Sequence, residues 1–138
     1  MSLDGYIADS QGSVNWLSGQ DHDDDGMDTY SEFAKEIDTI VMGRNTYHQI
    51  VTELSPDEWV YDAFTTYVVT HNPQTSSDKI QFTSENHVAL VKKLREAQGK
   101  GIWICGGANL IQQLVQEDMI DCYYITVIPT ILGAGIRL

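Results

Sequence analysis

Short, continuous runs of apolar residues alternate along this chain with stretches in which the apolar residues have helical spacing. Four of these runs are predicted to be buried strands, because each is short and is followed within three residues by Gly or Pro. They are Thr39–Met42, Thr66–Thr70, Ile102–Cys105 and Cys122–Ile128. Continuous rather than alternating runs are typical of strands that helices cover on both faces. The pattern therefore predicts an α/β fold, in which helices flank a central, mostly parallel sheet.

Three amphipathic helices are expected between the strands. Their apolar positions lie three or four residues apart within Tyr30–Ile37, Val88–Leu94 and Leu110–Val115. Gly99 is the expected C-terminal stop of the second helix. With 138 residues, no repeat and no linker, the chain is predicted to be a single domain spanning residues 1–138. Both ends are abrupt, because Ser2–Gly5 reads as the exit of a strand and the chain stops just after a Gly-rich turn, so we expect terminal segments to be missing.

The composition argues against several classes of protein. A formal net charge of −12 repels nucleic acid and anionic membranes. No apolar run reaches the roughly 18 to 20 residues that span a bilayer, and no basic region precedes an apolar stretch at the N-terminus, as it would in a secretory signal. Cys105 and Cys122 have neither CxxC spacing nor nearby histidines, which argues against a zinc site and a disulfide scaffold. We expect two reduced core thiols in a cytoplasmic protein that holds no metal.

Two turns between a strand and a helix are candidates for phosphate binding. In the first, Gly43 lets the backbone approach a ligand closely, Arg44 supplies a planar cation, and Thr46 adds a hydroxyl group at the start of a helical turn. In the second, Gly106 and Gly107 separate a strand from a helix, which suits a pyrophosphate at the helix N-terminus. Each turn by itself is as well explained by an ordinary tight glycine turn.

A third loop supports the nucleotide interpretation. Thr70 and His71 follow the strand that lies between these two turns in the sequence, and they offer a hydroxyl group and an imidazole. In open α/β sheets, ligands bind beyond the carboxyl ends of the strands. Because all three loops lie at such ends, together they predict a nucleotide site more strongly than any one of them.

Motifs along nearly the whole chain resemble the dihydrofolate reductase superfamily, and they occur in the order of that family. They are Ser2–Ala8, Trp16–Leu17, Met42–Tyr47, Gly106–Leu110, Ile125–Thr126 and Gly133–Gly135. Within the superfamily, the chain is most similar to the reductase domain of the bifunctional riboflavin-biosynthesis deaminase-reductase, the RibD C-terminal-like branch. The deaminase signature of that protein, His-x-Glu with Pro-Cys-x-x-Cys, is absent. The resemblance is therefore to a reductase-type domain standing alone.

The resemblance implies a three-layer, dihydrofolate-reductase-like fold and an NADPH-dependent oxidoreductase, of the dihydrofolate reductase or 5-amino-6-(5-phosphoribosylamino)uracil reductase type. Such an enzyme transfers a hydride to a small heterocycle, of the 5-amino-6-ribosylaminouracil or pterin type. The residues implied to bind NADPH are Ile7, Ala8, Gly43, Arg44, Thr46, Thr70, His71, Gly106, Gly107, Ala108, Asn109 and Leu110. Those implied to bind substrate are Asp4, Trp16, Phe33 and Thr126. A homodimer is also implied.

Some features depart from the best-known relatives. No Lys or Arg occurs between Met1 and Phe33, which argues against a phosphorylated sugar as the substrate. The acidic residue by which dihydrofolate reductase contacts its pterin has no clear counterpart in the first helix, which argues against folate. Asp4 is equally well explained as a turn-forming residue before Gly5. No proton donor is predicted, because the four histidines fall in loops or on helix faces, where solvated side chains are common.

One acidic segment offers a competing interpretation. Asp21–Glu32 satisfies the EF-hand pattern for Ca²⁺, with Gly26 at the required sharp turn. Against this, Asp28 stands where EF-hands have an apolar residue, no entering helix is indicated and no second loop exists, so a solvated acidic loop is favoured. Two alternatives to a reductase stay open: a non-catalytic NADP(H)-binding or regulatory module on the same fold, and a Ca²⁺-binding protein.

Overall fold

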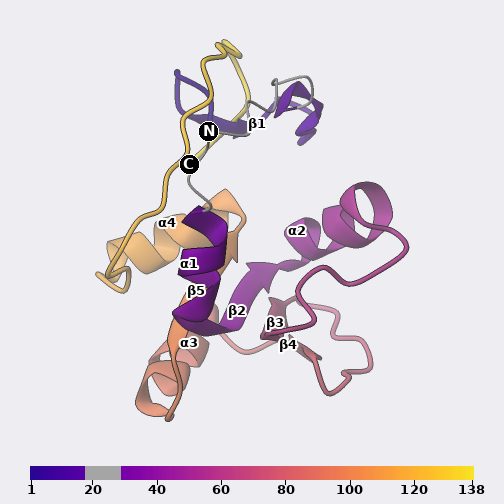
Figure 1. The fold of residues 1–138 in the computed structure, drawn as a ribbon, viewed down its shortest axis with the longest axis vertical. Helices are drawn as coiled ribbons and strands as arrows, with labels where there is room; N and C mark the ends of the chain where they lie inside the picture. The colour runs from indigo at the N-terminus through magenta and orange to yellow at the C-terminus, as the bar shows by residue number, and fades with distance from the viewer. Residues whose placement is uncertain (18–28) are drawn as a thin grey trace.

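A four-stranded parallel sheet forms the centre of the computed structural model, which describes residues 1–17 and 29–138 (Figure 1). The strand order is β4-β3-β2-β5, and every neighbouring pair is parallel. These strands are β2 Ile37–Gly43, β3 Thr65–Val69, β4 Ile80–Thr83 and β5 Gly101–Gly106. The prediction of an α/β fold with a mostly parallel central sheet is confirmed.

Helices cover both faces of this sheet. They are α1 Thr29–Lys35, α2 Arg44–Gln49, the π-helical turn η2 Ile50–Leu54, α3 His87–Glu96 and α4 Ala108–Gln116. Alternate residues of β2 divide between the two layers, because successive side chains of a strand point to opposite faces. Ile40 and Met42 pack in a cluster with Ile50 of η2, whereas Val41 packs with Leu90 of α3 and Leu114 of α4. The central strand is therefore buried on both sides, as its continuous apolar run predicts.

A separate two-stranded sheet joins the two ends of the chain. In it β1, Tyr6–Ala8, pairs antiparallel with β6, Ile136–Arg137. This small sheet and both termini lie at the top of Figure 1, beyond the four-stranded sheet. The short 3-10 helix η1, Asn15–Leu17, follows β1.

The prediction of a strand at Cys122–Ile128 is wrong. Residues 121–127 belong to no strand, and only Ile128 forms an isolated parallel bridge, with Ser2. The apolar, β-branched composition suits a strand, but a strand also needs a neighbouring backbone to pair with. Here the described backbone partners are the first residues of the chain: the Met1 ammonium donates to the Thr126 carbonyl oxygen, and the Ile128 N–H donates to the Met1 carbonyl oxygen.

Smaller differences concern helix boundaries and one strand. α1 ends at Lys35, and Ile37 begins β2 instead of closing the helix. α3 ends at Glu96 with Ala97 as its C-cap, so Gly99 is not its stop. β4 was not expected. Its sequence, Ile-Gln-Phe-Thr, has only four residues and mixes polar with apolar side chains, so it cannot be distinguished from a loop. Cys122 is exposed, which contradicts the expectation that both thiols lie in the core.

Candidate functional site

A cleft of about 1700 Å³ runs along the carboxyl ends of β2, β3 and β5. Its lining includes all twelve residues that were predicted to bind a nucleotide, from Ile7 to Leu110. Of the four predicted substrate residues, Phe33 and Thr126 line the cleft, whereas Asp4 and Trp16 do not. The topology explains this convergence, because parallel strands end at one edge of the sheet and their loops meet there.

The two glycine turns lie side by side in the cleft. β2 and β5 are neighbours, with Met42 paired to Gly106, so the turns that follow them are adjacent. A Cβ atom added to Gly43 would lie 3.8 Å from the Gly107 amide nitrogen. Gly106 has φ +136, a conformation that L side chains rarely adopt, and the peptide bond between Gly106 and Gly107 is cis. The bare backbone of both turns is thus open to close approach by a ligand.

The helices that follow these turns present free N-terminal amides. Gly43 is the N-cap of α2 and Gly107 the N-cap of α4, and neither supplies a side-chain hydrogen bond to the first turn. Uncapped N–H groups and the positive end of the helix dipole favour an anion at this place. Arg44 adds an exposed guanidinium beside the first turn, and Thr46 lies between the turns, with its hydroxyl oxygen 3.5 Å from a Cβ atom placed on Gly107. These groups fit the pyrophosphate and the further phosphate of an NADPH molecule.

Thr70 and His71 have different parts in the loop after β3. Thr70 is buried, and its hydroxyl oxygen accepts a hydrogen bond of 3.2 Å from the Asn72 N–H. Its side chain therefore shapes the turn. His71 is exposed on that turn and also lines the cleft, where its imidazole is available to a ligand.

Aromatic rings form one wall of the cleft. The Phe33 ring packs edge-on against Trp103, with 5.3 Å between the ring centroids, and tilted against Tyr124 at 4.7 Å. All three residues line the cleft, as do Ile7 and Ala8 of β1. The carboxylate of nearby Glu36 is the main cause that raises the pKa of the Tyr124 hydroxyl, so this phenol stays neutral. An apolar, aromatic wall suits a flat, uncharged ring.

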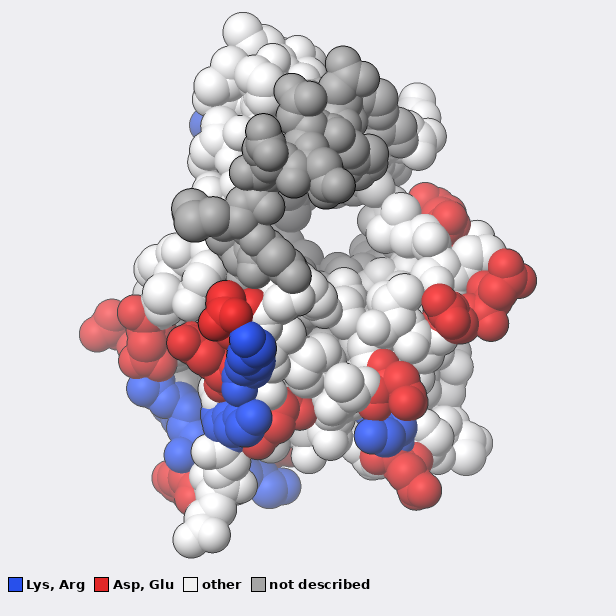
Figure 2. All heavy atoms as spheres, in the orientation of Figure 1, with Lys and Arg blue, Asp and Glu red and all other residues white. Residues whose placement is uncertain are grey.

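Three described Lys and Arg residues line the cleft as a whole: Arg44, Arg95 and Lys100. On the face shown in Figure 2, the Lys and Arg side chains gather mainly on the lower half of the molecule, next to Asp and Glu. This distribution agrees with the lack of Lys and Arg among the first 33 residues.

Asp4 ties the two ends of the chain together. Its Oδ1 accepts hydrogen bonds from the Ser2 hydroxyl at 2.7 Å and the Leu132 N–H at 3.2 Å, and its Oδ2 accepts one from the Gly133 N–H at 2.7 Å. These bonds, that of Ser2 first, lower the pKa of Asp4 to about 2. The carboxylate is thus engaged within the chain.

Trp16 lies half-buried in η1, and its indole nitrogen is buried with no partner among the described residues.

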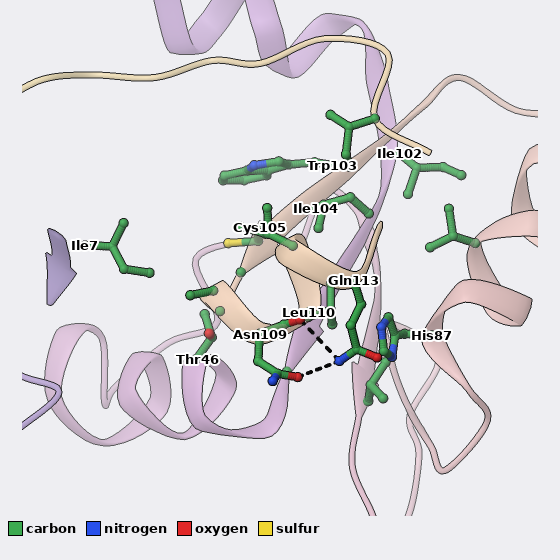
Figure 3. Close-up of a pocket in the computed structure, with 18 of the residues that line it drawn as sticks. Ile7, Thr46, His87, Ile102, Trp103, Ile104, Cys105, Asn109, Leu110 and Gln113 are labelled. Atoms are coloured by element: carbon green, nitrogen blue, oxygen red, sulfur yellow. Dashed lines mark hydrogen bonds between the residues drawn. The ribbon is translucent and has the colours of Figure 1, made fainter. Parts of the chain in front are cut away.

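Several lining residues were not predicted from the sequence. Trp103 and Cys105 were assigned only to a buried strand, although a strand that ends at a ligand site exposes its last side chains there. Burial raises the pKa of the Cys105 thiol to about 11, which keeps the thiol protonated near neutral pH. Gln113 and His87 also line the cleft (Figure 3). Nothing in the local sequence distinguishes them from solvated residues, because their position depends on how α3 and α4 pack.

The metal hypothesis falls largely on residues that are not described. Asp21–Asp28 lie outside the described residues, while Glu32 lies in α1 and pairs with Lys35. Within residues 1–17 and 29–138, no group of three or more His, Cys, Asp or Glu is placed to hold a metal ion. In the same part of the chain, no helix is both long enough and apolar enough to cross a membrane.

Comparison with known proteins agrees with this geometry. The sequence model of the RibD C-terminal domain matches residues 1–138. The chain belongs to the RibD C-terminal domain family. Membership of this RibD C-terminal family indicates a reductase-like domain.

Individual relatives are similar over the whole of this RibD C-terminal domain. "Uncharacterized protein YwjB" of Bacillus subtilis (strain 168) is 39% identical over 141 residues, which cover 100% of this chain and 78% of the relative. "Uncharacterized protein YyaP" of the same organism is 28% identical over 147 residues, which cover 98% and 74%. The crystal structure of "Putative riboflavin biosynthesis protein from Shewanella sp. PV-4" matches with a TM-score of 0.80 and 32% identity, over 99% of this chain and 77% of the other.

Proposed function

We propose that this RibD C-terminal domain is an NADPH-dependent reductase that transfers a hydride to a small, planar heterocycle without a phosphate group. The observation that carries the proposal is the pair of adjacent glycine turns, Gly43 and Gly106–Gly107, each followed by a helix without a side-chain cap. Arg44 supplies the positive charge that a strongly acidic chain otherwise lacks at this place. Family membership supports the same conclusion.

Different residues of the cleft bind different parts of NADPH. The backbone amides at Gly107 and the first turn of α4 hold the pyrophosphate, and Arg44, with Thr70 and His71 nearby, holds the phosphate of the adenosine ribose. Ile7 and Ala8 border the nicotinamide. Bound NADPH supplies the hydride, so the protein contributes binding, orientation and exclusion of water.

The aromatic wall of the cleft binds the substrate. Phe33, Trp103 and Tyr124 present ring faces and edges to a flat heterocycle, whose reducible C=N or C=O bond lies toward the nicotinamide side. A phosphate group on the substrate is disfavoured, because no basic residue precedes Phe33 and the wall itself is uncharged. The proton that completes the reduction comes from water. The cytoplasmic location and the homodimer stay predictions.

Nucleotide binding tests the proposal directly. NADPH at about 100 times its dissociation constant should raise the free energy of unfolding by roughly 2.7 kcal/mol, which a thermal unfolding scan detects easily. NADH, which lacks the ribose phosphate, should bind at least about tenfold more weakly. Arg44→Gln should remove most of that preference. Lys92→Gln, which removes the same charge from an exposed position outside the cleft, should leave it unchanged.

The outcomes separate the proposal from its alternatives. Stabilisation by neither nucleotide refutes the reductase. Binding of NADPH without oxidation of the cofactor, across pterins, aminouracils and flavin-like rings, favours the non-catalytic module. Stabilisation by CaCl₂ alone favours the acidic segment Asp21–Glu32 as the functional site.

A further inference from the structure

The small sheet formed by β1 and β6 is held together by its own polar contacts. The Leu138 N–H donates to the Gly5 carbonyl oxygen at 3.3 Å. The Asp4 carboxylate accepts from the N–H groups of Leu132 and Gly133 at 3.2 Å and 2.7 Å. These bonds stabilise the small sheet internally, but they do not fix its position relative to the four-stranded sheet. That position matters, because β1 lines the cleft.

Gln49 joins the small sheet to the four-stranded sheet and its helices. Its side chain lies half-buried at the C-terminal end of α2, and its Nε2 donates to the Gly12 carbonyl oxygen at 3.2 Å. The same nitrogen donates to Oε2 of Glu53 at 3.2 Å. Both partners are acceptors, so the amide nitrogen must face them and the side chain has one orientation. Among the described residues, this is the one hydrogen bond between Met1–Val14 and the four-stranded sheet with its helices.

The loop that receives this bond has a defined shape. The Asp9 Oδ1 accepts from the Gln11 N–H at 2.8 Å and the Ser13 N–H at 2.9 Å, and the Gly12 N–H donates to the Asp9 carbonyl oxygen at 3.1 Å. A Cβ atom placed on Gly12 would lie 4.0 Å from Cδ1 of Ile136, so the loop also lies against β6. A bond at Gly12 therefore holds the small sheet as a unit, and not the tip of a loop alone.

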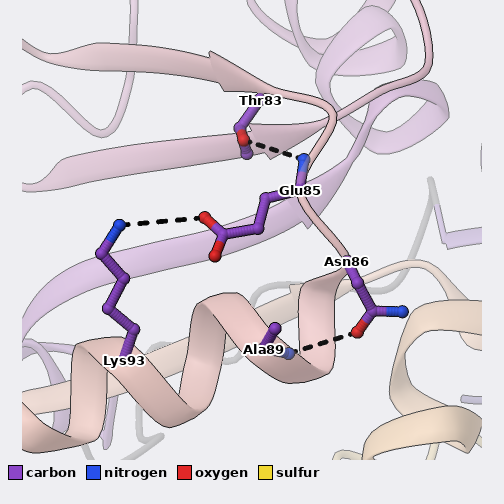
Figure 4. Close-up of polar contacts among 5 residues, drawn as sticks. All are labelled: Thr83, Glu85, Asn86, Ala89 and Lys93. Carbon is purple, nitrogen blue, oxygen red and sulfur yellow. Dashed lines mark hydrogen bonds and ion pairs between the residues drawn. The ribbon is translucent and has the colours of Figure 1, made fainter.

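Another part of the cleft rim is fixed by several contacts (Figure 4). Glu85 and Asn86 lie in the turn between β4 and α3, and both line the cleft. The Oδ1 of Asn86 accepts from the Ala89 N–H at 3.2 Å, which caps α3. The Glu85 N–H donates to the Thr83 hydroxyl oxygen at 3.0 Å, and its carboxylate pairs with Lys93 at 4.0 Å. Because this rim has its own support, the shape of the cleft depends on how the small sheet is held.

One helix carries both the phosphate-binding cation and the contact to the small sheet. Arg44 begins α2 and Gln49 ends it, five residues later, which corresponds to roughly 7.5 Å at 1.5 Å per residue. Both residues line the cleft, as does Gly12. The helix therefore sets the distance between the group that binds a phosphate and the backbone of the small sheet.

We propose that Gln49 is a positioning residue for the nicotinamide end of the cofactor. Its bond to Gly12 holds β1 in the place where Ile7 and Ala8 border the nicotinamide, whereas the phosphate-binding turns do not depend on this contact. Without the bond, β1 moves away from the ring and water reaches it, while the phosphates stay bound. This inference rests on the proposed NADPH site.

The test measures how much the nicotinamide ring adds to binding. Dissociation constants of NADPH and of 2′-phospho-ADP-ribose, which is the same nucleotide without its nicotinamide ring, are obtained on the whole chain by quenching of tryptophan fluorescence. The wild-type chain should bind NADPH more tightly. In Gln49→Leu this advantage should fall by about three- to tenfold, the effect of one lost hydrogen bond. Binding of 2′-phospho-ADP-ribose should stay within about twofold of wild type, because Leu keeps α2 helical and the phosphate site intact.

A second measurement reports the surroundings of the ring itself. Acrylamide quenches the fluorescence of bound NADPH by collision with the reduced nicotinamide, so the extent of quenching reports solvent access. Quenching should be stronger in Gln49→Leu than in the wild-type chain, because β1 no longer excludes solvent. Gln49→Lys should restore both results, because its ammonium group can donate to the Gly12 carbonyl oxygen and pair with Glu53. A role confined to folding does not predict that a different donor restores them.

Gln112→Leu is the matched control. Gln112 is exposed on α4 and lies outside the cleft lining, so this variant should keep the wild-type values in both measurements. If the wild-type chain binds the two nucleotides equally, or if Gln49→Leu resembles Gln112→Leu, the inference is overturned and the NADPH site stands. Equal weakening of both nucleotides in Gln49→Leu, or a failure of Gln49→Lys to restore the advantage, also overturns it. If neither nucleotide binds to the wild-type chain, the proposed function and this inference are overturned together.

Discussion

Replacing Gly135 with alanine should displace β1 from β6. Gly135 has φ +156, and a Cβ atom placed on it would lie 2.2 Å from the Ala8 carbonyl oxygen and 3.2 Å from the Ala8 carbonyl carbon. Real Cβ atoms are essentially never found within 3.0 Å of another atom, so the Ala8 carbonyl group must retreat by about 0.8 Å. Because that atom belongs to the backbone of β1, no side-chain rotation relieves the contact.

Two contributions set the expected loss of stability in Gly135→Ala. A non-glycine residue in this backbone conformation costs about 1–3 kcal/mol, and overpacking of a fitted contact costs a further 1–3 kcal/mol, roughly. Gly133→Ala is the matched control, because Gly133 also has a positive φ, +74, but a Cβ atom on it has nothing within 4 Å. It should lose only about 1–2 kcal/mol, the penalty for the left-handed conformation.

Urea unfolding and NADPH binding measure the two consequences. Gly135→Ala should lower the free energy of unfolding by about 2–6 kcal/mol, more than Gly133→Ala. It should also weaken NADPH binding, because Ile7 and Ala8 of β1 line the cleft. Equal losses of stability in the two variants, with unchanged binding in both, would refute the argument that the close contact at Ala8 positions β1.

Two further predictions concern titratable groups. The folded-state pKa of Asp4 is lowered to about 2, so its carboxylate stabilises the folded chain above the unfolded pKa near 3.8, and this contribution is lost as the pH falls toward 2. Asp4→Asn should therefore unfold at a lower temperature than wild type at pH 7, and the gap should narrow between about pH 4 and pH 2; a gap independent of pH would contradict the role given to the charge. In thiol titration at pH 8, exposed Cys122 should react quickly, whereas half-buried Cys105, with its pKa raised to about 11, should react only slowly until the chain unfolds, and Cys122→Ser should remove the fast phase. Two equally fast thiols would show that the Cys105 environment is open.

Sequence reasoning succeeded where a local pattern has a local cause. The run Thr39–Met42 predicted a strand buried on both sides, and β2 is that strand, because continuous apolar residues need cover on both faces. Gly43 and Gly106–Gly107 predicted open turns after parallel strands, and the two turns lie side by side. Phe33 lines the cleft beside Trp103, and its part in substrate binding stays a prediction.

Predictions from the sequence failed where the structure of a segment depends on contacts with residues far away in the chain. Cys122–Ile128 has the composition of a strand, yet pairing requires a second backbone, which composition does not supply. Asp4 has the signature of a turn or a ligand contact, and only the position of Leu132 and Gly133 shows that its carboxylate joins the chain ends.

By itself the sequence determined the α/β class, the parallel sheet and the glycine turns that suit phosphate, because these follow from apolar periodicity and from the backbone freedom of glycine. Only the tertiary structure decided which side chains line the cleft. His87 and Gln113 stand on different helices, and neither differs in local sequence from a solvated residue. Both line the cleft because α3 and α4 pack in one core cluster on the shared sheet, so their place in the lining is a property of the assembled fold.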